Sequence, residues 1–173
     1  MTDKICRIMD RIIRLAVLTA VLLTGCQSET AGGLTVNEYA VYMAVVRSKP
    51  PHPIVINSTV DTFGELSSGA LPELIPGIRS DTIESWVDRN EEAVSFPPDL
   101  PFEKGYEVVA RSEVAEFASY YSFSRVGFSQ DGQQAFVRFS FACAALCGEG
   151  AFYLLENKQG VWDIVHKSES WKS

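Results

Sequence analysis

The stretch SFSRVGFSQDGQQAFVRFSFA, residues 122–142, decides the fold of this chain. Asp131-Gly132 is a strong signal for a tight turn, and runs rich in aromatic and aliphatic residues flank it. The stretch therefore predicts a β-hairpin with strands over residues 122–129 and 133–142. In the second strand the odd-numbered positions from Ala135 to Phe141 share one face, because successive side chains alternate across a sheet.

A second hairpin follows in the sequence. Residues 151–156 and 161–167 are rich in strand-forming side chains, and Asn157-Lys158-Gln159-Gly160 between them favours a turn. Strands joined by such short turns pair antiparallel. The C-terminal third thus predicts a four-stranded antiparallel meander.

A helix is predicted upstream, over residues 36–47. Thr35 with Glu38 three positions later is the pattern of a capping box. The β-branched and aromatic content of this stretch makes a strand the alternative. The residues expected to form its apolar surface are Val36, Ala40, Met43 and Arg47, widened by Tyr39, Tyr42 and Val46.

The middle of the chain mixes both element types. Residues 54–60 and 106–110 predict strands, and Asp81 with Glu84 predicts the start of a second helix. A short third helix is expected over residues 112–120. Its start is indicated by Ser112, a residue that favours the first position of a helix.

Together these elements predict an α+β fold. Residues 34–173 are enough for one domain with a hydrophobic core. We expect a single domain in which the antiparallel C-terminal β-meander carries two or three helices packed on one face.

The N-terminus has the three parts of a signal peptide. Four basic residues precede an apolar run over residues 15–23, which is too short for an ordinary transmembrane helix, the alternative interpretation. Leu23-Thr24-Gly25-Cys26 then resembles the lipobox of bacterial lipoprotein precursors. The resemblance implies that residues 1–25 are removed and that Cys26 carries lipid. Residues 26–33, small and polar, would form a flexible tether.

The same resemblance predicts the location. In enterobacterial lipoproteins, an aspartate directly after the lipidated cysteine retains the protein at the inner membrane. In this chain the residue at that position is Gln27. Glutamine there implies an outer-membrane lipoprotein facing the periplasm. Loss of the leader changes the net charge from −7 to −9. An acidic body does not favour nucleic acid, so we expect attachment to the membrane through the lipid on Cys26.

Two cysteines remain beyond Cys26 in the processed chain. Cys143 and Cys147 predict one disulfide in an oxidising compartment, with two free thiols as the alternative. A metal site formed by the two cysteines would also need His52 and His166 as ligands, and only chance proximity in the fold could bring these together. A thioredoxin-like redox motif has two residues between its cysteines, whereas three separate Cys143 from Cys147. No metal or cofactor is expected.

A block over residues 122–173 resembles uncharacterised bacterial extracytoplasmic proteins. The resemblance supports the interpretation of this block as part of a folded domain, and it implies no reaction mechanism. The segments that carry it are SRVGF (124–128), QAFV (134–137), the cysteine loop with Gly148 and Gly150, YLLE (153–156) and GVW (160–162).

No catalytic motif is visible. A nucleophile elbow, a phosphate loop, a zinc-protease motif and a dinucleotide glycine pattern are all absent from the sequence, and neither histidine is expected to be catalytic. The candidate binding loop is Gly148, Glu149 and Gly150, where a constrained turn could expose backbone amides and a carboxylate. The alternative is that both glycines satisfy turn geometry and the glutamate is merely solvated.

The expected function is therefore a binding role. We predict a non-enzymatic binding or interaction module that meets an envelope protein partner, with an inhibitor or immunity-type role as a narrower version. The alternative is a hydrolase that acts on cell-envelope material. A pocket with His166, Glu149 or two facing acids would favour catalysis, whereas an apolar patch would favour binding.

Overall fold

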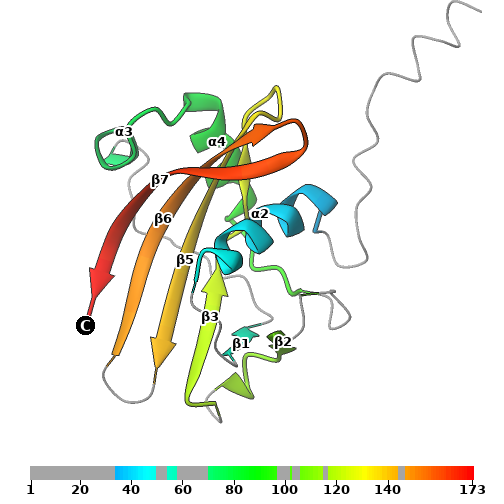
Figure 1. Ribbon diagram of the computed structural model, residues 1–173, viewed down its shortest axis with the longest axis vertical. Helices are drawn as coiled ribbons and strands as arrows, with labels where there is room; N and C mark the ends of the chain where they lie inside the picture. Colours follow the sequence, from blue (N-terminus) through cyan, green and yellow to red (C-terminus); the bar gives the residue numbers. More distant parts are fainter. Residues whose placement is uncertain are drawn as a thin grey trace, which may run out of the picture.

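The computed structural model describes residues 34–49, 54–57, 70–96, 102, 106–114, 117–143 and 147–173 (Figure 1). Three helices and seven strands lie in these ranges. They are α2 (Val36–Arg47), β1 (Ile54–Asn57), α3 (Leu71–Leu74), α4 (Ser80–Arg89), β2 (Tyr106–Val109), β3 (Ser119–Phe123), β4 (Gly127–Phe128), β5 (Gln134–Cys143), β6 (Cys147–Lys158) and β7 (Val161–Lys172).

The described strands form one mixed sheet. Its order is β2-β1-β3-β5-β6-β7, and the short β4 also pairs with β5. From β3 to β7 all pairs are antiparallel, which confirms the predicted meander and the α+β class. The parallel pairing of β1 with β2 and with β3 was not predicted, because parallel neighbours are joined through long connections that leave no local turn signal.

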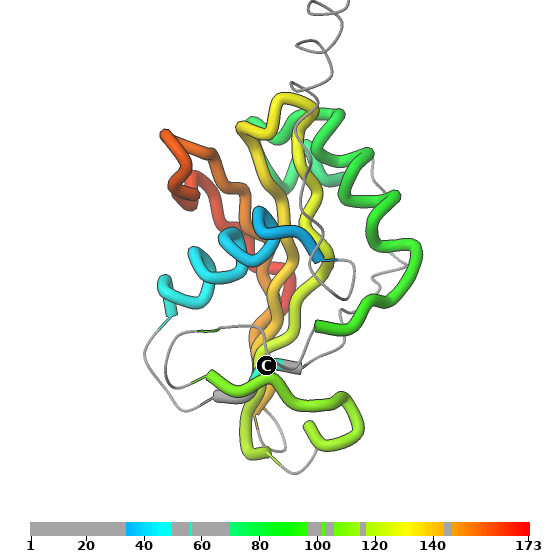
Figure 2. Tube along the Cα trace, turned by 90° about the vertical axis from the view of Figure 1, so that its right-hand side faces the viewer, coloured from blue at the N-terminus to red at the C-terminus, as the bar shows by residue number. Residues whose placement is uncertain are grey.

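Two of the helices, α3 and α4, share one face of the sheet as expected, whereas α2 lies on the other face (Figure 2). α2 packs against the face of Ala135, Val137 and Phe139, whereas α3 and α4 cover the face of Phe136. The physical reason is that the central strands are apolar on both sides. Phe136 and its neighbours in β6 would be exposed if only one face were covered.

The glycine at the start of β4 allows α4 to lie very close to the sheet. A Cβ atom on Gly127 would lie 2.6 Å from the Thr82 carbonyl oxygen and 2.6 Å from the Trp86 backbone nitrogen. α4 also begins two residues earlier than predicted, because Asp81 was expected to be its N-cap. Its N-cap is Arg79 and makes no side-chain capping bond, and Asp81 lies within the first turn.

Two predicted elements are wrong in type or extent. The third helix, expected over residues 112–120, is replaced by turns around residue 112 and by the start of β3. The strand expected over residues 122–129 is broken between Phe123 and Gly127. The physical cause of the break is that the backbone there turns toward two helices. Arg125 forms an ion pair with Glu38 of α2, and its backbone amide donates to the side chain of Asn90 at the end of α4.

β7 is an edge strand, and its pairing with β6 is irregular. Register shifts occur between Gly150 and Ala151 and between Leu154 and Leu155 of β6. Each shift leaves an extra residue in β7, Ser170 and Val165 respectively. The unpaired edge of β7 is therefore bent at two points.

The predicted disulfide between Cys143 and Cys147 is confirmed, and it joins the end of β5 to the start of β6.

Replacing both cysteines with serine is expected to lower the free energy of unfolding by roughly 2 kcal/mol, because the bond closes a small loop in the unfolded chain. The domain should still fold, since the β5–β6 ladder extends far beyond the bond. Urea unfolding followed by circular dichroism measures the change. Reduction of the wild-type chain should give the same loss, and global unfolding of the serine variant would contradict the estimate.

Candidate functional site

A groove of about 520 Å³ lies between α2 and the start of β7. In Figure 1, α2 lies in front of the sheet, and the β6–β7 turn lies beside its N-terminal half. The lining is mostly apolar, with one arginine and one aspartate. The lining residues are Val36, Tyr39, Ala40, Met43, Ala44, Arg47, Gly160, Val161, Trp162, Asp163 and Ile164.

One wall of the groove is the side of α2 that the sequence assigned to the core. The helix and its capping box form as predicted, but the side that packs on the sheet is centred on Val41, Tyr42 and Val45. The neighbouring stripe at Val36, Ala40, Met43 and Arg47 lines the groove instead. The sequence could not separate the two sides because α2 is apolar around most of its circumference.

The other wall comes from the β6–β7 hairpin. Gln159 and Gly160 have φ angles of 58° and 89°, the positive values that a two-residue hairpin turn requires. Beyond the turn, Trp162 is buried and its ring packs against Phe128 at 5.7 Å between centroids. The first residues of β7, Val161 and Trp162, thus form the apolar wall that faces α2.

Two valines on opposite walls of the groove are strongly exposed. Val36 is 54% exposed and Val161 is 62% exposed, both more than any other large apolar side chain among the described residues. Single exposed apolar residues are ordinary on protein surfaces. Two that line the same apolar groove indicate a surface suited to an apolar ligand.

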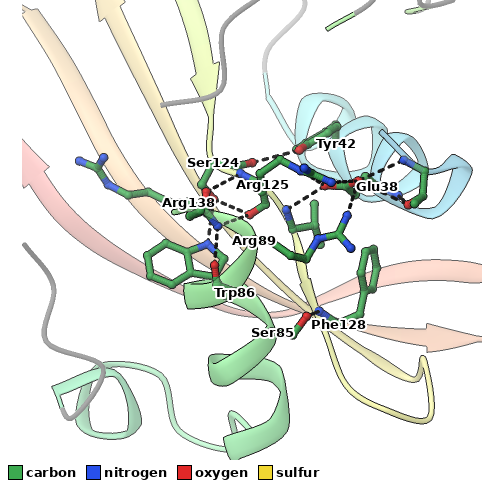
Figure 3. Close-up of polar contacts among 12 residues, drawn as sticks. Glu38, Tyr42, Ser85, Trp86, Arg89, Ser124, Arg125, Phe128 and Arg138 are labelled. Carbon is green, nitrogen blue, oxygen red and sulfur yellow. Dashed lines mark hydrogen bonds and ion pairs between the residues drawn. The ribbon is translucent and has the colours of Figure 1, made fainter. Parts of the chain in front are cut away.

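A buried ion-pair centre holds α2 in place (Figure 3). Glu38 of α2 has no exposed surface, and its carboxylate lies 2.6 Å from Arg89 Nη2 and 2.9 Å from Arg125 Nε. The backbone amides of Thr35 and Val126 donate to the same carboxylate at 3.1 and 3.3 Å. The carboxylate is thereby fully engaged, so the centre positions three segments of the chain and is closed to a substrate.

A second set of buried hydrogen bonds continues this centre. Tyr42 Oη donates to the Ser124 carbonyl oxygen at 3.0 Å, and Trp86 Nε1 donates to Ser124 Oγ at 2.9 Å. Burial raises the pKa of Tyr42 well above its ordinary value, and Glu38 raises it further, so the phenol stays a donor. α2 and α4 are therefore both bonded to the break between β3 and β4.

Glu149, predicted in a binding loop, lies in β6 and pairs with Lys49 just beyond α2. Lys49 Nζ is 2.5 Å from Glu149 Oε1 and 4.3 Å from the centroid of the Phe139 ring. The hydrogen bond from Lys49 lowers the pKa of Glu149 below its ordinary value. Glu149 thus ties β6 to the end of α2 and does not line the groove.

Gly148 and Gly150 also lie in β6, so their predicted place in a loop is wrong. The indole of Trp171 lies against both glycines. A Cβ atom on Gly148 would come within 2.7 Å of the Trp171 ring, and one on Gly150 would collide with Trp171 Nε1. The lack of a side chain at these two positions lets the aromatic ring approach the strand backbone closely.

The remaining predicted residues lie apart from the groove or outside the described residues. His166 lies in β7 opposite Leu154 and does not line the groove. Cys26 and His52 fall outside the described residues. Within the described ranges, no three histidine, cysteine or acidic side chains are grouped as metal ligands.

Among the helices in the described parts of the chain, none is both long enough and apolar enough to cross a bilayer. In comparisons with protein-family models, with curated proteins and with solved structures, nothing matches this chain.

Proposed function

We propose that this chain is a lipid-anchored, non-enzymatic binding module of the bacterial cell envelope, and that it binds through the groove between α2 and β7. The observation that carries the proposal is the apolar lining of the groove with the exposed Val36 and Val161. The lipobox-like sequence that ends at Cys26 supports the anchor and the location.

The chemistry of the groove favours binding over hydrolysis. Asp163 is the single carboxylate among its lining residues, and no histidine lines it. Glu149 is held by Lys49, and Glu38 is closed inside its ion pairs. A hydrolase would bring a general acid and a base together at the surface that meets its substrate.

Replacing Cys26 with serine tests the anchor. We expect the variant to stay as an unlipidated precursor that retains residues 1–25, because serine offers no thiol for lipid transfer. Incorporation of radiolabelled palmitate and the mass of the N-terminal fragment measure the effect, which should be complete. Cys6→Ser is the matched control, since Cys6 lies in the leader and its removal should leave processing unchanged. Normal processing of Cys26→Ser would contradict the proposed anchor.

A further inference from the structure

We propose that the groove between α2 and β7 receives one acyl chain of the lipid on Cys26 of the same molecule. The inference rests on the proposed lipidation of Cys26 and names the ligand of the groove. The position of the groove, its size and its lining support this inference.

The groove lies within reach of the lipid. Its first lining residue on α2 is Val36, and Cys26 precedes Leu34, the first described residue, by eight positions. Eight residues span at most about 28 Å when fully extended. The groove wall from Val36 to Arg47 comprises the twelve residues of α2, and its ends lie about 16 Å apart along the helix axis. The tether can therefore bring an acyl chain to either end of the groove.

A short tether also makes this encounter frequent. A ligand on a short flexible linker meets its own site at an effective concentration in the millimolar range. Residues 27–33, QSETAGG, are small and polar and have the composition of such a linker. A free lipid or a partner protein has to compete with that local concentration.

The size of the groove suits one chain. A water molecule takes up about 30 Å³ in the liquid, and a methylene group takes up nearly as much. A groove of about 520 Å³ has room for one acyl chain and not for the two or three chains of a lipoprotein anchor. The remaining chains would stay in the bilayer.

The lining is suited to methylene groups. Ala40 and Ala44 are small and leave space along α2, while Met43 and Ile164 offer apolar contacts on the two sides. Transfer of a methylene out of water stabilises by about 0.8 kcal/mol, whether the new surroundings are bilayer or groove. An acyl chain therefore loses no transfer free energy when it moves from the bilayer into the groove.

A photo-crosslink at the groove tests the inference in the full-length, lipidated chain. A diazirine analogue of leucine is placed at position 161, and cells are irradiated. We expect a crosslink between the peptide that contains residue 161 and the acyl chain on the N-terminal peptide. The same analogue at Val87, which is 38% exposed on α4 across the sheet, should give no such product. In a mixture of isotopically light and heavy chains, each crosslinked product should join two peptides with the same label, because the crosslink forms within one molecule.

Each other result overturns the inference. Crosslinks from position 161 to phospholipid or to another protein would assign the groove a different occupant. Mixed light–heavy products would place the acyl chain in a second copy. A lipidated Cys26 without any crosslink at 161 would remove the acyl chain from the groove and leave the proposed anchor standing, whereas an unmodified Cys26 would overturn the anchor itself.

A groove-filling variant gives a second measurement. Ala44→Trp places a large ring where the small side chain now leaves space along α2. We expect the crosslink yield at 161 to fall several-fold while the lipid mass on Cys26 stays unchanged. An unchanged yield in a folded Ala44→Trp chain would contradict occupancy of the groove.

Discussion

Glu38→Gln is expected to lower the free energy of unfolding by about 3 kcal/mol, because removal of one partner leaves buried charges uncompensated. Arg89 and Arg125 both converge on this carboxylate, and both side chains are largely covered. For a chain of this size the loss corresponds to about 6–12 °C in melting temperature. Thermal unfolding followed by circular dichroism measures it.

The control for this prediction is Glu84→Gln. Glu84 is an exposed residue of α4, so its replacement should change the free energy of unfolding by less than about 0.5 kcal/mol. Equal effects of the two variants would show that the Glu38 ion pairs contribute no net stability. Replacing Glu38, Arg89 and Arg125 together with leucine should recover much of the loss, because no unpaired charge would remain.

Gly127→Ala is expected to lower the free energy of unfolding by about 3 kcal/mol, because the new methyl group would overlap atoms that cannot rotate away. The nearest atoms include the Thr82 carbonyl oxygen and the Trp86 backbone nitrogen. Relief requires that α4 move away from the sheet or that β4 leave β5. Urea unfolding measures the change in stability.

Gly150→Ala is the matched control, because it also introduces a methyl group into a strand. The groups it would meet are the Ser170 hydroxyl and the indole of Trp171, which is 39% exposed near the C-terminus, and both side chains can rotate. We expect Gly150→Ala to cost less than Gly127→Ala, and Trp171→Ala to restore part of its loss. A larger effect for Gly150→Ala would show that the α4 backbone moves more readily than the indole.

The sequence predicted the parts of the fold that depend on local signals. The turns at Asp131-Gly132 and at Gly160 and the capping box of Thr35 each involve a few neighbouring residues, and all three form as expected. The strands β1 and β2 form within the predicted residues 54–60 and 106–110, but their parallel pairing has no comparable local signal. Residues 119–120 were expected in a helix but begin β3 and pair with β5 and β1, because tertiary pairing overrides weak helix propensity.

The candidate site was less predictable because it is built from distant residues. The capping box identified Glu38, but its ion pairs reach to Arg89 in α4 and to Arg125 beyond β3. An acidic residue inside an otherwise apolar helix was the available signal for a buried partner. The groove was missed because no periodicity distinguishes the two apolar sides of α2, and the strand glycines resembled a loop because the stacking of Trp171 is not a local feature.

The two bends in β7 have a consequence for crowding. Molecules held by the proposed lipid anchor would share a two-dimensional surface, where like edges would meet more often than in solution. A long straight edge strand there would template intermolecular sheets and fibrous deposits. The displaced residues Val165 and Ser170 interrupt the edge at intervals too short for a partner strand to zip along it. With the proposed anchor, such a shape would let many copies lie side by side on one leaflet and remain separate.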